Sequence, residues 1–132
     1  TMDDVSGYDD MVLLKRIPVT SFCEHHIAPF TGRASVAYLP GKHVVGLSRL
    51  ARVVEVYACR LQTQEALIAQ VAAAIEKALA ARGVAVIIEA EHQCISARGL
   101  RQPGMSAVTT RFLGAFATDA SLRDRFLALV RE

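Results

Sequence analysis

The sequence predicts an α+β fold, an antiparallel four-stranded sheet with helices on one face. The apolar residues follow strand spacing in four segments and helical spacing in three, in the order strand, strand, helix, helix, strand, strand, helix. Both strand pairs have connections short enough for antiparallel pairing, and this arrangement is typical of α+β proteins. Because such a sheet leaves two edge strands unpaired, we also expect it to join the sheet of a partner subunit.

The first strand pair is expected at residues 11–19 and 33–39. The earlier segment is an apolar run, and Pro18 within it indicates an edge strand or an irregularity because proline cannot donate a ladder hydrogen bond. The later segment alternates between the two faces of a strand. Residues 1–9 are polar, so we expect a loose N-terminal segment before a domain that spans residues 10–132.

Two helices are expected between the strand pairs. The first begins near Ser48, which is a plausible N-cap. Its apolar residues form one helical stripe through Leu50, Val53, Val54 and Tyr57. The second helix covers about residues 63–82, and its alanines allow close packing. Gly83 is well placed as the residue that follows its C-terminus.

The second strand pair is expected at residues 84–98 and 107–116, and a last helix at residues 121–131. Side chains two positions apart lie on the same face of a strand. His92 and Cys94 are therefore expected to lie on one face of the long strand.

Length, charge and cysteine content exclude several classes of protein. The chain has 132 residues, which fits one domain able to bury its own core. Its net charge of +2 is too small to predict a nucleic-acid partner, and no apolar run approaches the length of a membrane span. Three cysteines, an odd number with metal-like spacing, indicate a reducing compartment. We therefore expect a cytoplasmic protein that binds neither nucleic acid nor membranes.

Residues that bind soft or borderline metals are concentrated in two clusters, at positions 23–26 and 92–94. Cys23 and His26 have the Cys-x-x-His spacing, which lets a thiolate and a ring nitrogen reach one ion in a tight turn. Cys94 would be a third ligand from a distant strand. Three ligands of these types suit zinc and leave one position for water, whose pKa then falls to about 7.

The remaining histidines of the two clusters, His25 and His92, each lie close to an expected ligand, where proton-transfer groups belong. Other interpretations of the same residues stay open. Cys23 and Cys94 could form a disulfide or remain two buried thiols, and the clusters could form a structural zinc module that makes protein contacts.

The chain from about residue 10 to its end resembles the catalytic domain of GTP cyclohydrolase I. Five stretches match the family in its order and spacing, which is far more specific than any single match. They are Cys23-Glu24-His25-His26, Gly46-Leu47-Ser48-Arg49-Leu50-Ala51-Arg52, Arg60-Leu61-Gln62-Thr63-Gln64-Glu65, Glu91-His92-Gln93-Cys94 and Ala97-Arg98-Gly99.

The resemblance implies the tunnelling fold, in which antiparallel sheets of several subunits join into a barrel. It also implies a homodecamer of two face-to-face pentamers, with active sites at subunit interfaces. The implied reaction converts GTP to 7,8-dihydroneopterin triphosphate and formate. Zinc would be held by Cys23, His26 and Cys94, and its water would attack C8 of the guanine. His25 and His92 would move protons, and Ser48 and His25 would lie near the ribose hydroxyls.

The resemblance also implies how the substrate is held. Glu65 would read the guanine edge, because a carboxylate offers two acceptors to guanine's adjacent N1–H and 2-amino donors, and Gln64 would assist. Arg52 and Arg98 would hold the triphosphate with guanidinium forks. Arg49 is a further substrate-binding candidate, at a position where the family usually has lysine.

A rival interpretation is a relative of the same fold that binds GTP or a pterin without catalysis, or that acts on a different purine or pterin. All the expected ligands and proton-transfer histidines are present, which argues against a non-catalytic relative. Without the family match, Glu65 would more often be a solvated carboxylate in the first turn of a helix. Arg49 and Arg52 would be solvated residues on a polar helix face.

Overall fold

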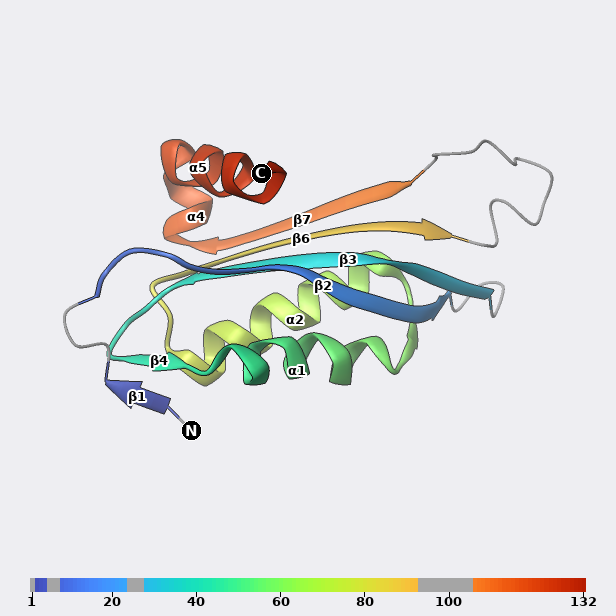
Figure 1. Ribbon diagram of the computed structural model, residues 1–132, viewed down its shortest axis with the longest axis horizontal. Coiled ribbons are helices and arrows are strands. Elements are labelled where there is room, and N and C mark those ends of the chain that lie inside the picture. The colour runs from blue at the N-terminus through green and yellow to red at the C-terminus, as the bar shows by residue number, and fades with distance from the viewer. Residues whose placement is uncertain (1, 5–7, 24–27, 93–105) are drawn as a thin grey trace.

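The computed structural model describes residues 2–4, 8–23, 28–92 and 106–132 (Figure 1). Its main sheet has the strand order β5-β2-β3-β6-β7. The strands are β2 (Val12–Cys23), β3 (Ala28–Leu39), β5 (Leu61–Gln62), β6 (Gly83–His92) and β7 (Ala107–Gly114). The four long strands are antiparallel neighbours, which confirms the predicted four-stranded antiparallel sheet. The short β5 adds a parallel pairing to the outer edge of β2.

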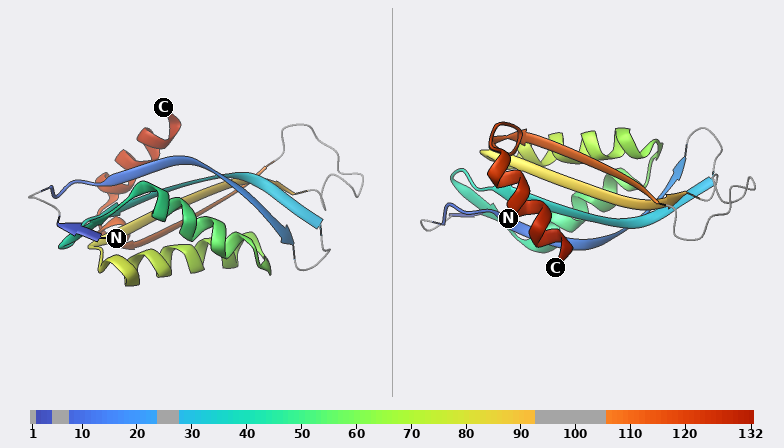
Figure 2. Two further views of the ribbon diagram at one scale, coloured as in Figure 1. Left: turned by 60° about the horizontal axis from the view of Figure 1, so that its bottom comes forward. Right: turned by 90° about the horizontal axis from the view of Figure 1, so that it is seen from above.

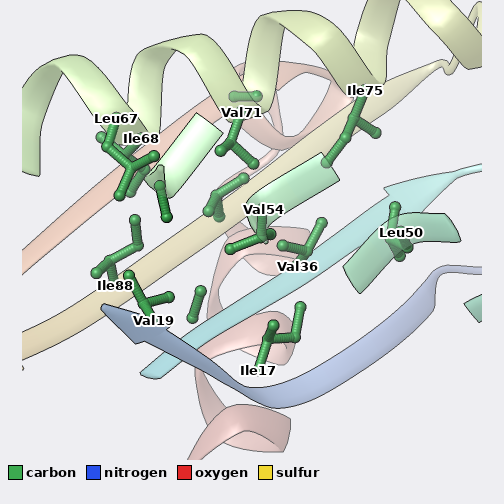
Figure 3. Close-up of a cluster of buried hydrophobic side chains, with 14 of the residues drawn as sticks. Ile17, Val19, Val36, Leu50, Val54, Leu67, Ile68, Val71, Ile75 and Ile88 are labelled. Carbon is green, nitrogen blue, oxygen red and sulfur yellow. The ribbon is translucent and has the colours of Figure 1, made fainter. Parts of the chain in front are cut away.

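Two helices, α1 (Leu47–Ala58) and α2 (Gln64–Leu79), cover one face of this sheet (Figures 1 and 2). Their apolar stripes pack against alternate residues of the strands, as the predicted periodicities require. The buried side chains of these two helices and of the sheet face beneath them form one cluster (Figure 3). Its labelled members are Ile17, Val19, Val36, Leu50, Val54, Leu67, Ile68, Val71, Ile75 and Ile88.

The expectation that the helices share one face holds for α1 and α2 but not for the C-terminal helices α4 (Ala115–Thr118) and α5 (Ala120–Arg131). These two lie on the opposite face, near one end of the sheet (Figure 1). The reason is that this face also carries apolar residues, so it needs cover too. Phe116 and Phe126 are fully buried there against Leu39 and Ala85.

Element ends differ from the sequence prediction at two helices. The N-cap of α1 is Gly46 rather than Ser48, and no side chain caps it. Helix α2 ends earlier than expected, with Ala80 in the left-handed conformation at φ 46°, while Gly83 already belongs to β6. A Cβ at Gly83 would lie 3.1 Å from the Phe116 side chain, so glycine here allows close packing rather than a helix end.

Three short strands were not expected. Besides β5, strand β1 (Met2–Asp4) pairs antiparallel with β4 (His43–Val45), so part of the polar N-terminal segment is paired. The prediction of an edge position at Pro18 is confirmed in the described residues, because β5 pairs with the outer side of β2 only at Phe22 and Cys23, and a register shift lies just before Pro18, between Leu14 and Ile17. In the described part of the chain, no helix is both long and apolar enough to cross a membrane.

One end of the sheet brings together segments that are far apart in the sequence. Phe30 of β3 is the cross-strand partner of Ser21 on β2 and of His92 on β6. Strands β2 and β6 therefore finish at the same end of the sheet, with β3 between them (Figure 1). Helix α2 begins at this end, and its last turn lies at the other end, near β4.

Candidate functional site

The first turn of α2 supplies two adjacent polar side chains that point in different directions. Thr63 caps the helix, because its Oγ1 accepts a hydrogen bond from the Ala66 amide at 3.1 Å. Successive helical residues are separated by about 100° around the axis. As a result, the Gln64 side chain points into the protein and is 1% exposed, whereas Glu65 is exposed to solvent.

The Gln64 amide is surrounded by polar atoms of β6 and β7. Its Nε2 lies 3.1 Å from the Ile88 carbonyl oxygen, from the Ala107 carbonyl oxygen and from Thr109 Oγ1. Its Oε1 lies 2.7 Å from His92 Nε2. A single buried amide therefore connects the start of α2 to two neighbouring strands and to the imidazole.

His92 is the last residue of β6 and is half-buried. Its ring stacks on Phe30 of the neighbouring strand, with ring centroids 4.7 Å apart and planes inclined by 13°. Burial lowers the pKa of His92, because a charged imidazolium is poorly solvated there, and the negative charge of Glu65 partly opposes this. The net result is a pKa below the usual histidine value, which favours a neutral ring at neutral pH.

A cavity of about 230 Å³ lies beside Glu65, between α2 and β7. It is lined by Glu65, Ile68, Ala69, Thr109, Thr110 and Arg111. The cavity combines an apolar helix face with a carboxylate, a guanidinium and two hydroxyl groups. Such a mixture suits a flat polar ring, since the apolar wall covers its face and the polar groups bind its edge.

A second cavity of about 610 Å³ lies between the start of α1 and the end of α2. Three predicted site residues, the catalytic candidate Ser48 and the substrate-binding candidates Arg49 and Arg52, line it together with Ile75 and other residues of the last turns of α2. Ten residues of α2 separate Ile75 from Glu65, which corresponds to roughly 15 Å along the helix. Within one chain, the structure thus brings Glu65, Gln64 and His92 together but keeps Ser48, Arg49 and Arg52 apart from them.

Four predicted site residues, His25, His26, Cys94 and Arg98, lie outside the described residues. Cys23 is the last residue of β2, where its backbone pairs with Ala28 and Gln62. Among the residues that the structure describes, no three His, Cys, Asp or Glu residues gather closely enough to hold a metal ion. The predicted zinc ligands are therefore not tested by the described part of the chain.

Sequence reasoning missed two parts of this site. Phe30 was not singled out, because only the pairing of β3 with β6 reveals that it stacks on His92. The acceptors around Gln64 were missed for the same reason, since they belong to β6 and β7. The sequence signal that was available, the period-two spacing of β6, identified His92 but not its neighbours.

Comparison with known proteins gives the family. The family model described as GTP cyclohydrolase I matches residues 1–131. The chain belongs to the GTP cyclohydrolase I family. Membership agrees with the five motif stretches that suggested it, two of which contribute Gln64, Glu65 and His92 to the end of the sheet described above.

Curated relatives named GTP cyclohydrolase 1 match nearly the whole chain. The relative from Maricaulis maris (strain MCS10) is 54% identical over 130 residues, covering 98% of this chain and 63% of the relative. That from Sinorhizobium fredii (strain NBRC 101917 / NGR234) is 56% identical over 131 residues, covering 99% and 64%. That from Hyphomonas neptunium (strain ATCC 15444) is 58% identical over 127 residues, covering 96% and 62%. The chain thus spans less than two thirds of the length of these members of the family.

A solved structure, the crystal structure of the archaeosine synthase QueF-Like in the apo form, resembles the fold. It aligns with a TM-score of 0.67 at 18% sequence identity and covers 82% of this chain and 97% of its own. At this identity the likeness concerns the fold alone. It supports the α+β tunnelling fold that the family membership implies.

Proposed function

We propose that this protein is a zinc-dependent hydrolase that opens the guanine imidazole ring of GTP at C8, releasing formate and forming 7,8-dihydroneopterin triphosphate. The observation that carries the proposal is the cluster at the end of the sheet. There an imidazole, His92, is held by Gln64 and Phe30 beside the exposed carboxylate of Glu65. A fixed proton carrier next to a carboxylate that can read a base is what ring opening of a purine requires. Membership of the GTP cyclohydrolase I family supports the same reaction.

The residues that we propose as metal ligands are of types that fit zinc. Two thiolates, of Cys23 and Cys94, and the imidazole of His26 are the ligand types that zinc prefers. Strand topology supports the grouping, because Cys23 ends β2 and the chain reaches Cys94 two residues after β6 ends at His92. When bound, zinc would supply a Lewis acid that makes water nucleophilic at neutral pH.

The protein's own residues would bind the base and move the protons. Glu65 would accept hydrogen bonds from guanine N1–H and the 2-amino group, with the cavity beside it receiving the ring. His25 and His92 would transfer protons while the ring opens and formate leaves. The lowered pKa of His92 leaves its ring neutral at the start, so it can first take up a proton and later return it.

The triphosphate would be held by Arg49, Arg52 and Arg98, with Ser48 near the ribose hydroxyls. In one chain, Arg52 lines a cavity at the far end of α2 from Glu65. A complete site would therefore combine Glu65 and His92 of one subunit with Arg49 and Arg52 of a neighbour. This is our reason for proposing a homo-oligomer, a decamer by analogy with the family. A nucleotide substrate and thiolate zinc ligands both fit the cytoplasm.

The experiment is release of formate from GTP by the full-length, zinc-loaded protein, with zinc content measured in parallel. His92→Ala should retain zinc but release formate about 100- to 10,000-fold more slowly, the usual effect of removing a positioned acid or base. His43→Ala is the matched control, because His43 lies in β4 and is exposed. That variant should behave like the parent protein.

Two results would contradict the proposal. A parent protein that binds GTP and zinc but releases no formate would be the non-catalytic relative considered above. Undiminished formate release by His92→Ala would remove His92 from the mechanism and leave proton transfer to His25 or to water.

A further inference from the structure

We propose that Gln64 is a positioning residue that fixes the tautomer of His92, with hydrogen on Nε2, and that it does not read the guanine base. The inference deepens the proposed function and rests on it for the catalytic role of His92. The hydrogen-bond geometry itself stands independently, because it depends only on atoms of α2, β6 and β7.

The orientation of the Gln64 amide follows from its neighbours. The carbonyl oxygens of Ile88 and Ala107 can only accept hydrogen bonds, and both lie 3.1 Å from one end of the amide. That end must therefore be the NH₂ group, because the amide oxygen would face two acceptors. The oxygen Oε1 is then directed at His92.

The tautomer of His92 follows from the orientation of Gln64. Oε1 is an acceptor without a hydrogen, so the His92 nitrogen 2.7 Å away must donate. Neutral His92 therefore carries its hydrogen on Nε2, and Nδ1 is left with a free lone pair. When His92 takes up a proton, the new N–H bond forms at Nδ1 and the Nε2–H bond to Gln64 stays intact. Release of that proton restores the starting state.

The ring plane is fixed by a second, independent contact. Phe30 is fully buried and stacks on the imidazole at 4.7 Å with nearly parallel planes. Stacking prevents the ring from tilting, and the hydrogen bond to Gln64 prevents it from flipping about its χ2 torsion. Together the two contacts hold Nδ1 of His92 in one direction, which is the requirement for a positioned proton carrier.

Base reading by Gln64 is incompatible with this arrangement. The side chain is 1% exposed, and both ends of its amide already have partners. Turning the amide toward a substrate would remove the Nε2 donor from the Ile88 and Ala107 carbonyl oxygens and the acceptor from His92 Nε2–H. Glu65, the next residue, is exposed and free to take that role. The two residues that the family motif places side by side would thus have separate functions.

The variant test is Gln64→Leu, compared with Gln70→Leu on the same helix. Leucine has a similar size but cannot accept a hydrogen bond from His92. We expect zinc content and the KM for GTP to stay near the parental values while kcat falls about 10- to 100-fold, the size of loss known for removing the partner that orients a metal-bound histidine. Gln70→Leu, outside the site, should leave both constants unchanged. A raised KM with unchanged kcat in Gln64→Leu would overturn the proposal and make Gln64 a base reader.

A measurement on the parent protein keeps the inference testable even where Gln64→Leu fails to fold. Nitrogen-15 NMR of histidine-labelled protein distinguishes the two neutral tautomers, and the His92 signals are identified by their loss in His92→Ala. We expect protonated Nε2 and bare Nδ1 for His92. Protonated Nδ1 would overturn the proposal. The NMR result is independent of the proposed function. A protein that released no formate from GTP would contradict that function, but its His92 tautomer could still be measured.

Discussion

At the scale of single residues, Gln64 and Glu65 show what sequence can and cannot assign. The family motif placed both in substrate binding, with Gln64 as an assistant to Glu65. Helix geometry separates them, since one side chain is buried under β6 and β7 and the other faces solvent. Gln64 lies four residues before Ile68, on the apolar stripe of α2, so the helical period already favours Gln64 over Glu65 for the buried side. The partners of Gln64 on β6 and β7 could not be predicted in this way, because they depend on how the sheet packs against the helix.

The prediction at this scale concerns Glu65. Glu65→Gln replaces one acceptor with a donor that would face guanine's own donors, while the helix and its Thr63 cap stay unchanged. Loss of a hydrogen bond to a charged group typically costs roughly 1.5–3 kcal/mol, so GTP should bind at least tenfold more weakly. Isothermal titration with GTP, together with zinc analysis, measures the effect.

The matched control for this variant is Glu76→Gln, three turns further along α2 and away from the cavity beside Glu65. It should bind GTP like the parent protein. Parental affinity in Glu65→Gln would mean that another residue reads the base. Loss of zinc in that variant would instead point to a structural role for Glu65.

At the scale of elements, hydrophobic periodicity predicted the four long strands and the helices α1 and α2, because burial of one side of an element imposes a fixed spacing of apolar residues. The short strands β1, β4 and β5 could not be predicted, since two or three residues carry no measurable period. The end of α2 was misplaced because the residue in the left-handed conformation is Ala80, whereas the sequence offered Gly83. Helix ends depend on tertiary contacts more than on any single residue.

The prediction at this scale concerns the contact between β3 and β6. A Cβ added at Gly32 would overlap the Glu89 carbonyl oxygen and lie 2.6 Å from the Ala90 Cα, and both are backbone atoms that cannot move aside. Gly32→Ala should therefore destabilise the fold by about 1–3 kcal/mol or more, the range found for overpacked sites. Chemical denaturation measures the change in the free energy of unfolding.

Gly46→Ala is the matched control, because a Cβ there meets nothing within 4 Å and the backbone is extended. It should cost about 0.5–1 kcal/mol, because alanine is a poorer helix N-cap than glycine, and so less than Gly32→Ala. Equal effects of the two substitutions would show that β3 and β6 are not packed as closely at Gly32 as described.

At the scale of the whole molecule, the sequence predicted the sheet and the helices α1 and α2 but not the position of α5. Placing a terminal helix on one face or the other depends on which faces remain apolar once the sheet forms. The strands carry apolar residues on this second face as well, among them Leu13, Leu39 and Ile87, but strand spacing alone does not show which element will cover them. The docking of α5 is reinforced by an ion pair of 2.5 Å between Arg125 and Asp10 and by a hydrogen bond from Lys15 to the Leu129 carbonyl.

The arrangement of α2 bears on assembly. Glu65 is at its first turn, and the cavity lined by Arg49 and Arg52 is beside its last turns, so the two groups lie near opposite ends of α2 within one chain. In the described residues, the outer edge of β7 has no neighbouring strand, which leaves backbone groups available for a partner sheet. We therefore expect a closed ring in which each site is shared between subunits.

The last prediction tests shared sites by mixing two inactive variants. Glu65→Gln and Arg52→Ala should each release formate slowly as uniform oligomers. When the two variants are co-expressed in equal amounts, each position in a symmetric ring holds either variant with a probability of about one half. A site that takes Glu65 from one subunit and Arg52 from its neighbour therefore has both residues intact in about a quarter of cases. Formate release should recover toward about a quarter of the parental rate, with light scattering reporting a large oligomer. No recovery in oligomers shown to contain both variants, or a parental monomer that turns over GTP, would mean that each site belongs to one chain.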